Sequence, residues 1–292
     1  MTITTRRSFI ALAAGSSLLA LAGCTATGSL SEKISAPVPA TNEAPVVASL
    51  DVASGALTGG TVVTLAGTGL ATVVGVTVGG APASSVAVDA NGNVSFVTPA
   101  AVDYQPADAA VALSTAEGTV LDAGKMFSYQ VITPVDRQLQ YAFTYWKDYN
   151  LDEWSVFSDN DCGNFVNQTL VARGWEQNDD WYSDYGSGGG YSLSWIRGNE
   201  MDDYLNSRSD TTRLELADRA SVKVGDVVMF DWDPQNDNGV DHTMLVSRVD
   251  TNPDGTTSVK FAGHTVDAQY RDLDTAITVE NPGGTAHFYS IA

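Results

Sequence analysis

The fold of the second half of the chain is decided by the stretch Asp161-Cys162-Gly163-Asn164-Phe165-Val166-Asn167-Gln168-Thr169-Leu170-Val171. Residues that can share one helical face recur in this stretch at helical spacing; they are Phe165, Val166, Thr169 and Leu170. Asn160 and Asp161 are residue types that cap helices, and Gly174 is a typical helix stop. The stretch therefore predicts a helix with Cys162 in its first turn.

The segments around this helix predict an α+β domain. Residues 135–149 and 195–205 have helical periods, whereas residues 226–232, 242–249, 259–264 and 287–291 have the pattern of strands. The turn Asn252-Pro253-Asp254-Gly255 joins two of these strands as a hairpin. We therefore expect His242, which begins one strand, and His264, which ends the next, to emerge at the same end of the sheet.

A different pattern precedes this domain, between residues 44 and 131. Short valine-rich runs alternate there with glycine-containing turns, which is typical of an all-β sandwich. The segments Leu57-Thr58-Gly59-Gly60-Thr61 and Val76-Thr77-Val78-Gly79-Gly80-Ala81-Pro82 resemble the TIG/IPT family. The resemblance implies an immunoglobulin-like domain and says nothing about its ligand.

The N-terminal segment has the features of an export signal. Arg6 and Arg7 precede an apolar run that ends in Leu21-Ala22-Gly23-Cys24. The arginine pair resembles a twin-arginine signal, and the final four residues resemble a bacterial lipobox, which implies acylation of Cys24. We expect a signal peptide at 1–23, a flexible linker at 24–43 and lipid anchoring to the outer face of the bacterial cytoplasmic membrane. The alternatives are an uncleaved anchor or a plain signal peptide cut elsewhere.

Composition excludes several classes of function. The 292 residues carry a formal net charge of −20 with only 2 Cys and 3 His. This charge disfavours nucleic-acid binding, and two cysteines can build neither a disulfide framework nor a zinc site of cysteine pairs. Four carboxylates could attract Ca²⁺, but their spacing does not place glycine at the sixth position of a calcium loop or supply its distal glutamate; they are Asp231, Asp233, Asp237 and Asp241. We therefore expect no metal and no cofactor.

The remaining chemistry depends on one thiol and two imidazoles. A cysteine at a helix N-terminus lies where backbone N–H groups favour the thiolate. Attack on an amide also needs a base and a group that orients the base, for which His242 and His264 are available. These residues alone leave open an inert buried cysteine and two structural histidines. We take His287, which lacks a surrounding motif, as an ordinary strand residue.

Residues 161–168 resemble the Asp-Cys-x-Asn-Phe-Val-x-Gln box of the putative amidase domain family, whose relatives are the papain-like CHAP and NlpC-type cell-wall hydrolases. Later blocks agree with that family over residues 134–292; they are Ser194-Trp195, Val224-Gly225-Asp226-Val227, Asp241-His242 and Phe261-Ala262-Gly263-His264-Thr265. The resemblance implies a papain-like fold, with Cys162 as nucleophile, His242 as general base and His264 as its orienter. Gly163 departs from the family, in which a hydroxyl residue usually follows the cysteine.

We expect Asp161 and Trp195 in the oxyanion pocket, with a helix cap as the alternative role of Asp161. The resemblance predicts a surface-anchored cysteine amidase or peptidase that hydrolyses an amide bond in cell-wall peptide through a thioester. Acyl transfer or transpeptidation by the same triad is one alternative, and a catalytically silent cell-surface binding module is the other. We expect a monomer whose partners are peptidoglycan or another peptide substrate and, through the lipid alone, the membrane.

Overall fold

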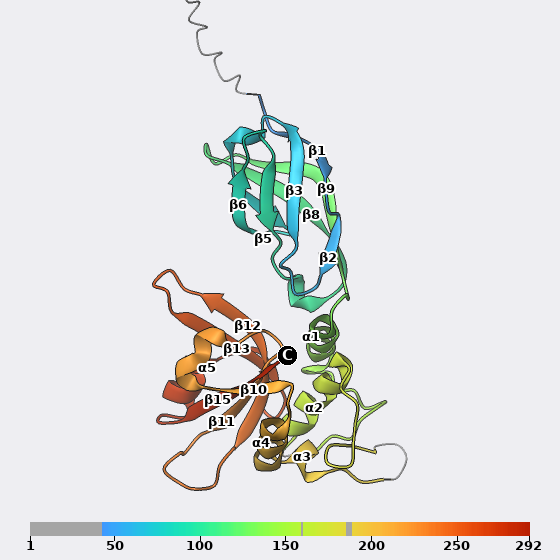
Figure 1. Ribbon diagram of the computed structural model, residues 1–292, viewed down its shortest axis with the longest axis vertical. Helices are drawn as coiled ribbons and strands as arrows, with labels where there is room; N and C mark the ends of the chain where they lie inside the picture. Colours follow the sequence, from blue (N-terminus) through green and yellow to red (C-terminus); the bar gives the residue numbers. More distant parts are fainter. Residues whose placement is uncertain (1–42, 159, 185–188) are drawn as a thin grey trace, which may run out of the picture. The chain divides into compact units, whose positions relative to one another are not determined.

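The computed structural model describes residues 43–158, 160–184 and 189–292 (Figure 1). The expected signal peptide, Cys24 and nearly all of the expected linker lie outside the described residues. The described residues from 43 to 292 belong to one compact unit. Among the described residues, no helix combines the length and the apolar character that crossing a membrane requires.

The first domain is a β-sandwich, as its valine-rich runs predicted. One sheet has the order β1 (Val46–Leu50), β3 (Val62–Thr68), β7 (Val94–Val97) and β6 (Ser84–Val88). The other has the order β2 (Ser54–Ala56), β9 (Val120–Gln130), β8 (Ala107–Thr115), β4 (Val73–Val78) and β5 (Ala81–Pro82). The short helices η1 (Leu70–Thr72) and η2 (Val102–Tyr104) connect strands. Alternate residues of β3, Val63 and Leu65, are fully buried, so the strand has the period of two expected of a sandwich.

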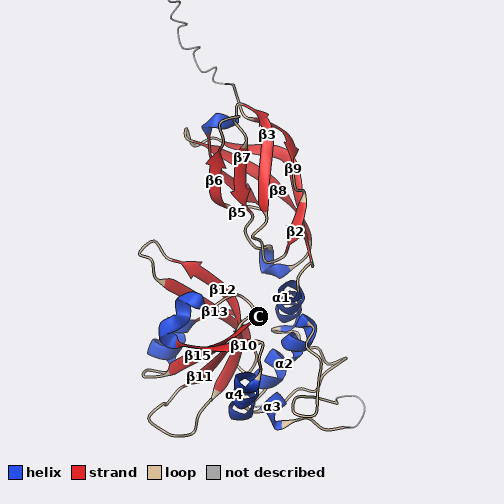
Figure 2. Cartoon of the chain, in the orientation of Figure 1, coloured by secondary structure: helices blue, strands red, loops and turns tan. Residues whose placement is uncertain are grey.

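The second domain combines helices with one antiparallel sheet (Figure 2). The strand order is β10 (Thr211–Glu215), β15 (Thr285–Ile291), β11 (Val227–Asp231), β12 (His242–Thr251), β13 (Thr257–Gly263) and β14 (Ala268–Asp272). The helices are α1 (Pro134–Tyr145), α2 (Cys162–Arg173), α3 (Leu193–Ile196), α4 (Gly198–Ser207) and α5 (Leu273–Thr275), with η3 (Leu216–Ser221) and η4 (Ala276–Glu280). The predicted strands of this domain are confirmed, and β10, β14 and α5 are additional.

Two helical predictions need correction. The single helix predicted over residues 195–205 is two helices, because Arg197 has extended backbone angles between α3 and α4. The helix predicted to continue to residue 149 ends at Tyr145. Its beginning follows the sequence closely: Thr133 and Asp136 form a capping box, and Pro134 occupies the first helical position, where its missing N–H costs nothing.

The two faces of the sheet are covered by different helices. Val227 and Met229 of β11 pack with α2 residues such as Val166. Their neighbour Val228 points the other way and packs with Leu273 of α5. This alternation follows from the strand period of two, and it explains why the central strands are apolar on both faces.

Candidate active site

The helix that carries the thiol begins where the sequence predicted. α2 starts at Cys162, and Gly174 ends it with φ of 113°, a backbone conformation that glycine adopts without strain. Asp161 occupies the N-cap position, but its side chain makes no capping hydrogen bond. The first backbone N–H groups of a helix have no partner within the helix, so they are available to groups beside Cys162.

Polar residues of the box anchor buried tryptophans. The Asn164 Oδ1 atom accepts a hydrogen bond of 2.8 Å from the indole N–H of Trp195. The Asn167 Oδ1 atom accepts one of 2.7 Å from the indole N–H of Trp181. Because an unpaired polar group in the core is costly, these two asparagines specify which indoles pack against α2. This part of the box is therefore structural.

The thiol of Cys162 is nearly buried, with a residue exposure of 4%. Burial raises the pKa of this thiol, and the backbone N–H groups of Thr243 and Gly163, which lower it, offset part of the effect. The thiol donates a hydrogen bond of 3.3 Å to Oδ1 of the exposed Asn160. The resting side chain is thus a neutral thiol held between buried backbone donors and one exposed amide.

His242 begins β12, as predicted, and is also buried, with 5% exposure. Its ring lies 6.0 Å from that of Trp232. Burial lowers the pKa of His242 to about 4, with a further contribution from the charge of Arg271. Its Nε2 atom has no hydrogen-bond partner among the residues that the structure describes. Within the described part of the chain, no hydrogen bond joins His242 to Cys162, although the next residue, Thr243, faces the thiol.

His264 makes a different set of contacts from the one expected. Its Nδ1 atom lies 2.5 Å from Oδ2 of Asp161, and its Nε2 atom lies 2.8 Å from the carbonyl oxygen of Tyr145. Its ring stacks on Phe165 with centroids 4.0 Å apart. The two ring nitrogens thus contact an oxygen on each side, one from Asp161 and one from the backbone at the end of α1. The expected role of His264 as orienter of His242 does not match these contacts.

Strand register explains this difference. The two histidines lie at the same end of the sheet, as expected, with Leu245 opposite Ala262 on β12 and β13. If this register continues, His264 lies opposite Thr243, one residue from His242. Successive residues of a strand point to opposite faces. His264 therefore lies on the α2 face of the sheet together with Thr243, whereas His242 lies on the opposite face together with Met244.

The two expected pocket residues have structural partners. Asp161 is 3% exposed, and besides His264 its carboxylate accepts hydrogen bonds from the backbone N–H of Phe157 and the side chain of Asn164. Trp195 is fully buried. It packs in the core on the α2 side of the sheet, whereas we expected Trp195 to line the oxyanion pocket.

His287 has a partner that the sequence did not indicate. Its Nε2 atom lies 2.5 Å from Oδ1 of Asp202, which also accepts a hydrogen bond from the Tyr289 hydroxyl. This pair links β15 to α4.

Three of the four carboxylates considered for Ca²⁺ bring oxygens within 4.8 Å of one another; they are Asp231, Asp233 and Asp241.

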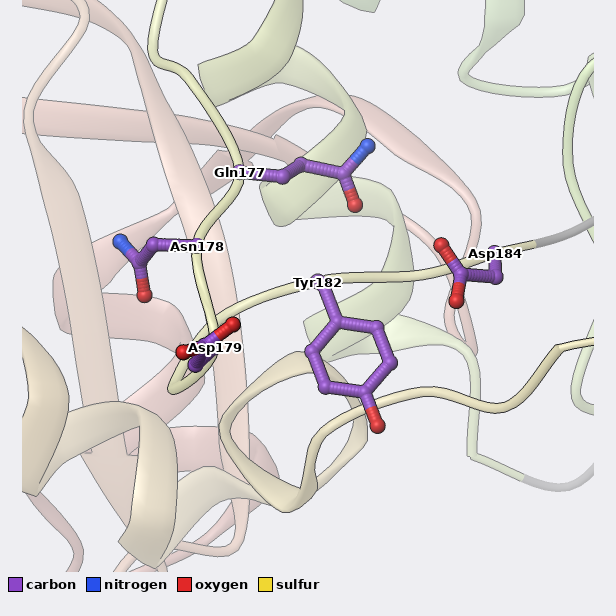
Figure 3. Close-up of a pocket in the computed structure, with 5 residues that line it drawn as sticks. All are labelled: Gln177, Asn178, Asp179, Tyr182 and Asp184. Atoms are coloured by element: carbon purple, nitrogen blue, oxygen red, sulfur yellow. The ribbon is translucent and has the colours of Figure 1, made fainter.

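An open pocket of about 500 Å³ lies apart from these residues (Figure 3). It is lined by Gln177, Asn178, Asp179, Tyr182 and Asp184. The first three lie on one segment of the chain and the last two on the next, as Figure 3 shows. Tyr182 lines this pocket, whereas its neighbour Trp181 is fully buried.

The fold and site define a mixed α/β domain whose thiol occupies the first position of a central helix. Residues 134–289 match the model of the putative amidase domain, and residues 45–128 match the IPT/TIG domain. The chain belongs to the putative amidase domain family, which supports a hydrolase acting on amide bonds, and it carries an immunoglobulin-like TIG domain in front.

Other comparisons add no functional argument. A search of curated proteins found no match. Among solved structures, SGBP-B of the Bacteroides ovatus mixed-linkage glucan utilization locus, in complex with a mixed-linkage heptasaccharide, is 22% identical over 27% of this chain and 19% of its own, with a TM-score of 0.22. An auxiliary nutrient binding protein from Bacteroides thetaiotaomicron is 15% identical over 75% of this chain and 42% of its own, with a TM-score of 0.24.

Proposed function

We propose that this protein is an exported, lipid-anchored cysteine amidase of papain-like fold that hydrolyses an amide bond in cell-wall peptide. The observation that carries the proposal is the position of Cys162, at the first residue of α2, with the N–H groups of Gly163 and Thr243 directed at its sulfur. Backbone donors at such a position stabilise negative charge as it develops on sulfur and on the attacked carbonyl oxygen. Family membership supports amide bonds as the substrate class.

In the proposed reaction, His242 takes the thiol proton and sulfur bonds to the carbonyl carbon. The carbonyl electron pair moves to oxygen and returns as the C–N bond breaks, while His242 gives its proton to the departing amine. Water then adds to the thioester, and the C–S bond breaks to give a carboxylic acid and the free thiol. The unpartnered Nε2 and the neutral state of His242 suit a general base. In the resting protein His242 shares its face of the sheet with Phe230 and Trp232, away from α2, so this step requires its ring to turn towards Cys162 when substrate binds. The resemblance of Asp241-His242 to a block of the family supports His242 as the proposed base.

The contacts of His264 favour a positioning role for this residue. Its pairing with Asp161 fixes the residue before Cys162, and its contact with the Tyr145 carbonyl ties α1 to the same point. Cell-wall peptide is proposed because the lipobox-like segment before Cys24 would place the mature protein outside the membrane. Acidity of the chain would repel anionic wall polymers, so affinity must come from contacts at the site.

The test is digestion of purified peptidoglycan by the ectodomain and by its Cys162→Ala variant, followed by mass spectrometry of the products. We expect new amine and carboxylate ends with the wild type alone. New amide cross-links in place of carboxylate ends would instead indicate acyl transfer. The buried thiol, 4% exposed and without a hydrogen bond to His242 among the described residues, favours a second candidate, a silent binding module. Products from neither protein, together with retained binding to the wall, would support that candidate.

A further inference from the structure

Among the described residues whose polar atoms contact the sulfur of Cys162, Asn160 is the exposed one. Gly163 and Thr243, whose backbone N–H groups face the sulfur, are buried. Asn160, whose side-chain oxygen lies 3.3 Å from the sulfur, is exposed. A carbonyl group bound at the sulfur would therefore lie within reach of the Asn160 amide.

The backbone holds Asn160 at this position. Its N–H donates to the carbonyl oxygen of Phe157 at 3.0 Å. The N–H of the next residue, Asp161, donates to the hydroxyl of Thr265 at 3.0 Å. These two bonds fix the chain on both sides of the amide, so a substitution of the Asn160 side chain removes the amide and leaves its backbone anchors in place.

The amide of Asn160 offers an acceptor and two donors in one group. In the resting protein its oxygen accepts the hydrogen of the neutral thiol. Once the thiol proton has left, an amide oxygen beside a sulfur anion is unfavourable, and a half-turn about the Cβ–Cγ bond brings the NH₂ group to the same place. The amide then donates to the negative charge that forms during attack.

We propose that Asn160 is a catalytic residue, the second donor of the oxyanion hole beside the backbone N–H of Cys162, and this rests on the proposed function. As sulfur bonds to the carbonyl carbon, the C=O electron pair moves to oxygen, and this oxyanion accepts hydrogen bonds from the Asn160 amide and the Cys162 N–H. The charge returns to the carbonyl when the amine leaves, and both donors are released. After its half-turn, the Asn160 amide donates to the charge of the transition state and not to the resting thiol.

Two electrophiles separate this role from a general effect on the thiol. N-acetyl-alanine p-nitrophenyl ester acylates sulfur through a tetrahedral oxyanion, whereas iodoacetamide alkylates sulfur by direct displacement and forms no oxyanion. Both need the thiolate, so the ratio of their rate constants cancels changes in thiol ionisation. Rates are measured for the wild type, Asn160→Ala, Asn160→Asp and the matched control Asn206→Ala, an exposed asparagine on α4. Cys162→Ala provides the background.

We expect the ester-to-iodoacetamide ratio to fall by about 10- to 100-fold in Asn160→Ala. Loss of one oxyanion-hole donor lowers kcat by about 100- to 1000-fold in a well-organised site, so the expected range ends where that one begins. Asn160→Asp should lower it at least as far, since a carboxylate repels the oxyanion, and Asn206→Ala should leave it unchanged. If the wild-type ratio exceeds that of N-acetylcysteine and stays equally high in Asn160→Ala, the proposed role of Asn160 is wrong while the proposed function stands. A wild-type ratio equal to that of N-acetylcysteine would overturn the role of Asn160 together with the proposed function.

Discussion

Nδ1 of His264 lies 2.5 Å from Oδ2 of Asp161, and both side chains are almost fully buried. Asp161 directly precedes Cys162, so this pair ties the start of α2 to the end of β13. A buried pair of this kind is costly to break, because the remaining carboxylate loses one of its buried partners and keeps only its hydrogen bonds from Phe157 and Asn164. The pair thus determines where the thiol stands in the domain without touching it.

His264→Ala should lower the free energy of unfolding by about 3–5 kcal/mol, because it leaves the Asp161 carboxylate buried without this partner. Urea denaturation at pH 7 measures the loss. His287→Ala is the comparison, since His287 forms the same kind of contact with Asp202 in a more exposed place and should cost less. A loss below about 1 kcal/mol combined with abolished activity would assign His264 a chemical role instead.

The thiol should resist alkylation at neutral pH. Burial raises the pKa of Cys162 and lowers that of His242 to about 4, so the resting pair is a neutral thiol and a neutral imidazole. The rate of reaction with iodoacetamide should therefore increase mainly above the ordinary thiol value of about 8.5, in the wild type and in His242→Ala alike. A reactive plateau below pH 7 that disappears in His242→Ala would show a thiolate–imidazolium pair and contradict this prediction.

The buried His242 should make the domain less stable in acid. In the folded protein its pKa is about 4, against an unfolded value of 6.5. Between these values the unfolded chain binds more protons, so the free energy of unfolding decreases as the pH falls from about 6.5 towards 4. The difference corresponds to roughly 3 kcal/mol, at about 1.4 kcal/mol per pKa unit. Urea denaturation of the wild type and His242→Gln at pH 7.5 and 4.5 should show a smaller loss in the variant, and equal losses would contradict the prediction.

Gly163, the position that departs from the family, lies close to the backbone of α3. A Cβ at this position would stand 3.3 Å from the carbonyl oxygen of Trp195 and 3.5 Å from the carbonyl carbon of Ile196. Gly163→Ala should therefore change the free energy of unfolding by less than about 1 kcal/mol, because a helix-propensity gain opposes the tight contact. Gly163→Val adds a branched side chain against the same backbone and should cost about 1–3 kcal/mol. Thermal unfolding of both variants tests the contrast, and equal stabilities would contradict it.

The sequence located the main elements of the second domain because each has a strong local signal. The helix at Cys162 has a face of apolar residues and a glycine stop, and His242 opens a strand bounded by turns. It could not locate the partners of His264, because these depend on the register between β12 and β13 and on where α1 ends. The helical period of the sequence continues to residue 149, so it did not indicate that α1 ends at Tyr145 and that the Tyr145 carbonyl oxygen contacts His264.

The environment of Trp195 was also beyond local pattern. The Ser194-Trp195 block led us to expect this residue near the nucleophile, but its indole N–H donates to Asn164 inside the core. In the structure, Asn164 and Asn167 lie on a helix that is buried nearly throughout, and buried amides require partners. Indole N–H groups, which only donate, are suitable partners for amide oxygens.

The central claim is that Cys162 attacks an amide carbonyl and carries its acyl group. The direct measurement is the intact mass of the ectodomain, quenched in acid during turnover of soluble wall-peptide fragments. The account predicts an added mass equal to the acyl part of the substrate without its amine, located on Cys162 by peptide mapping and absent from Cys162→Ala. Release of the amine at the wild-type rate by Cys162→Ala, with no adduct on the wild type, would contradict it.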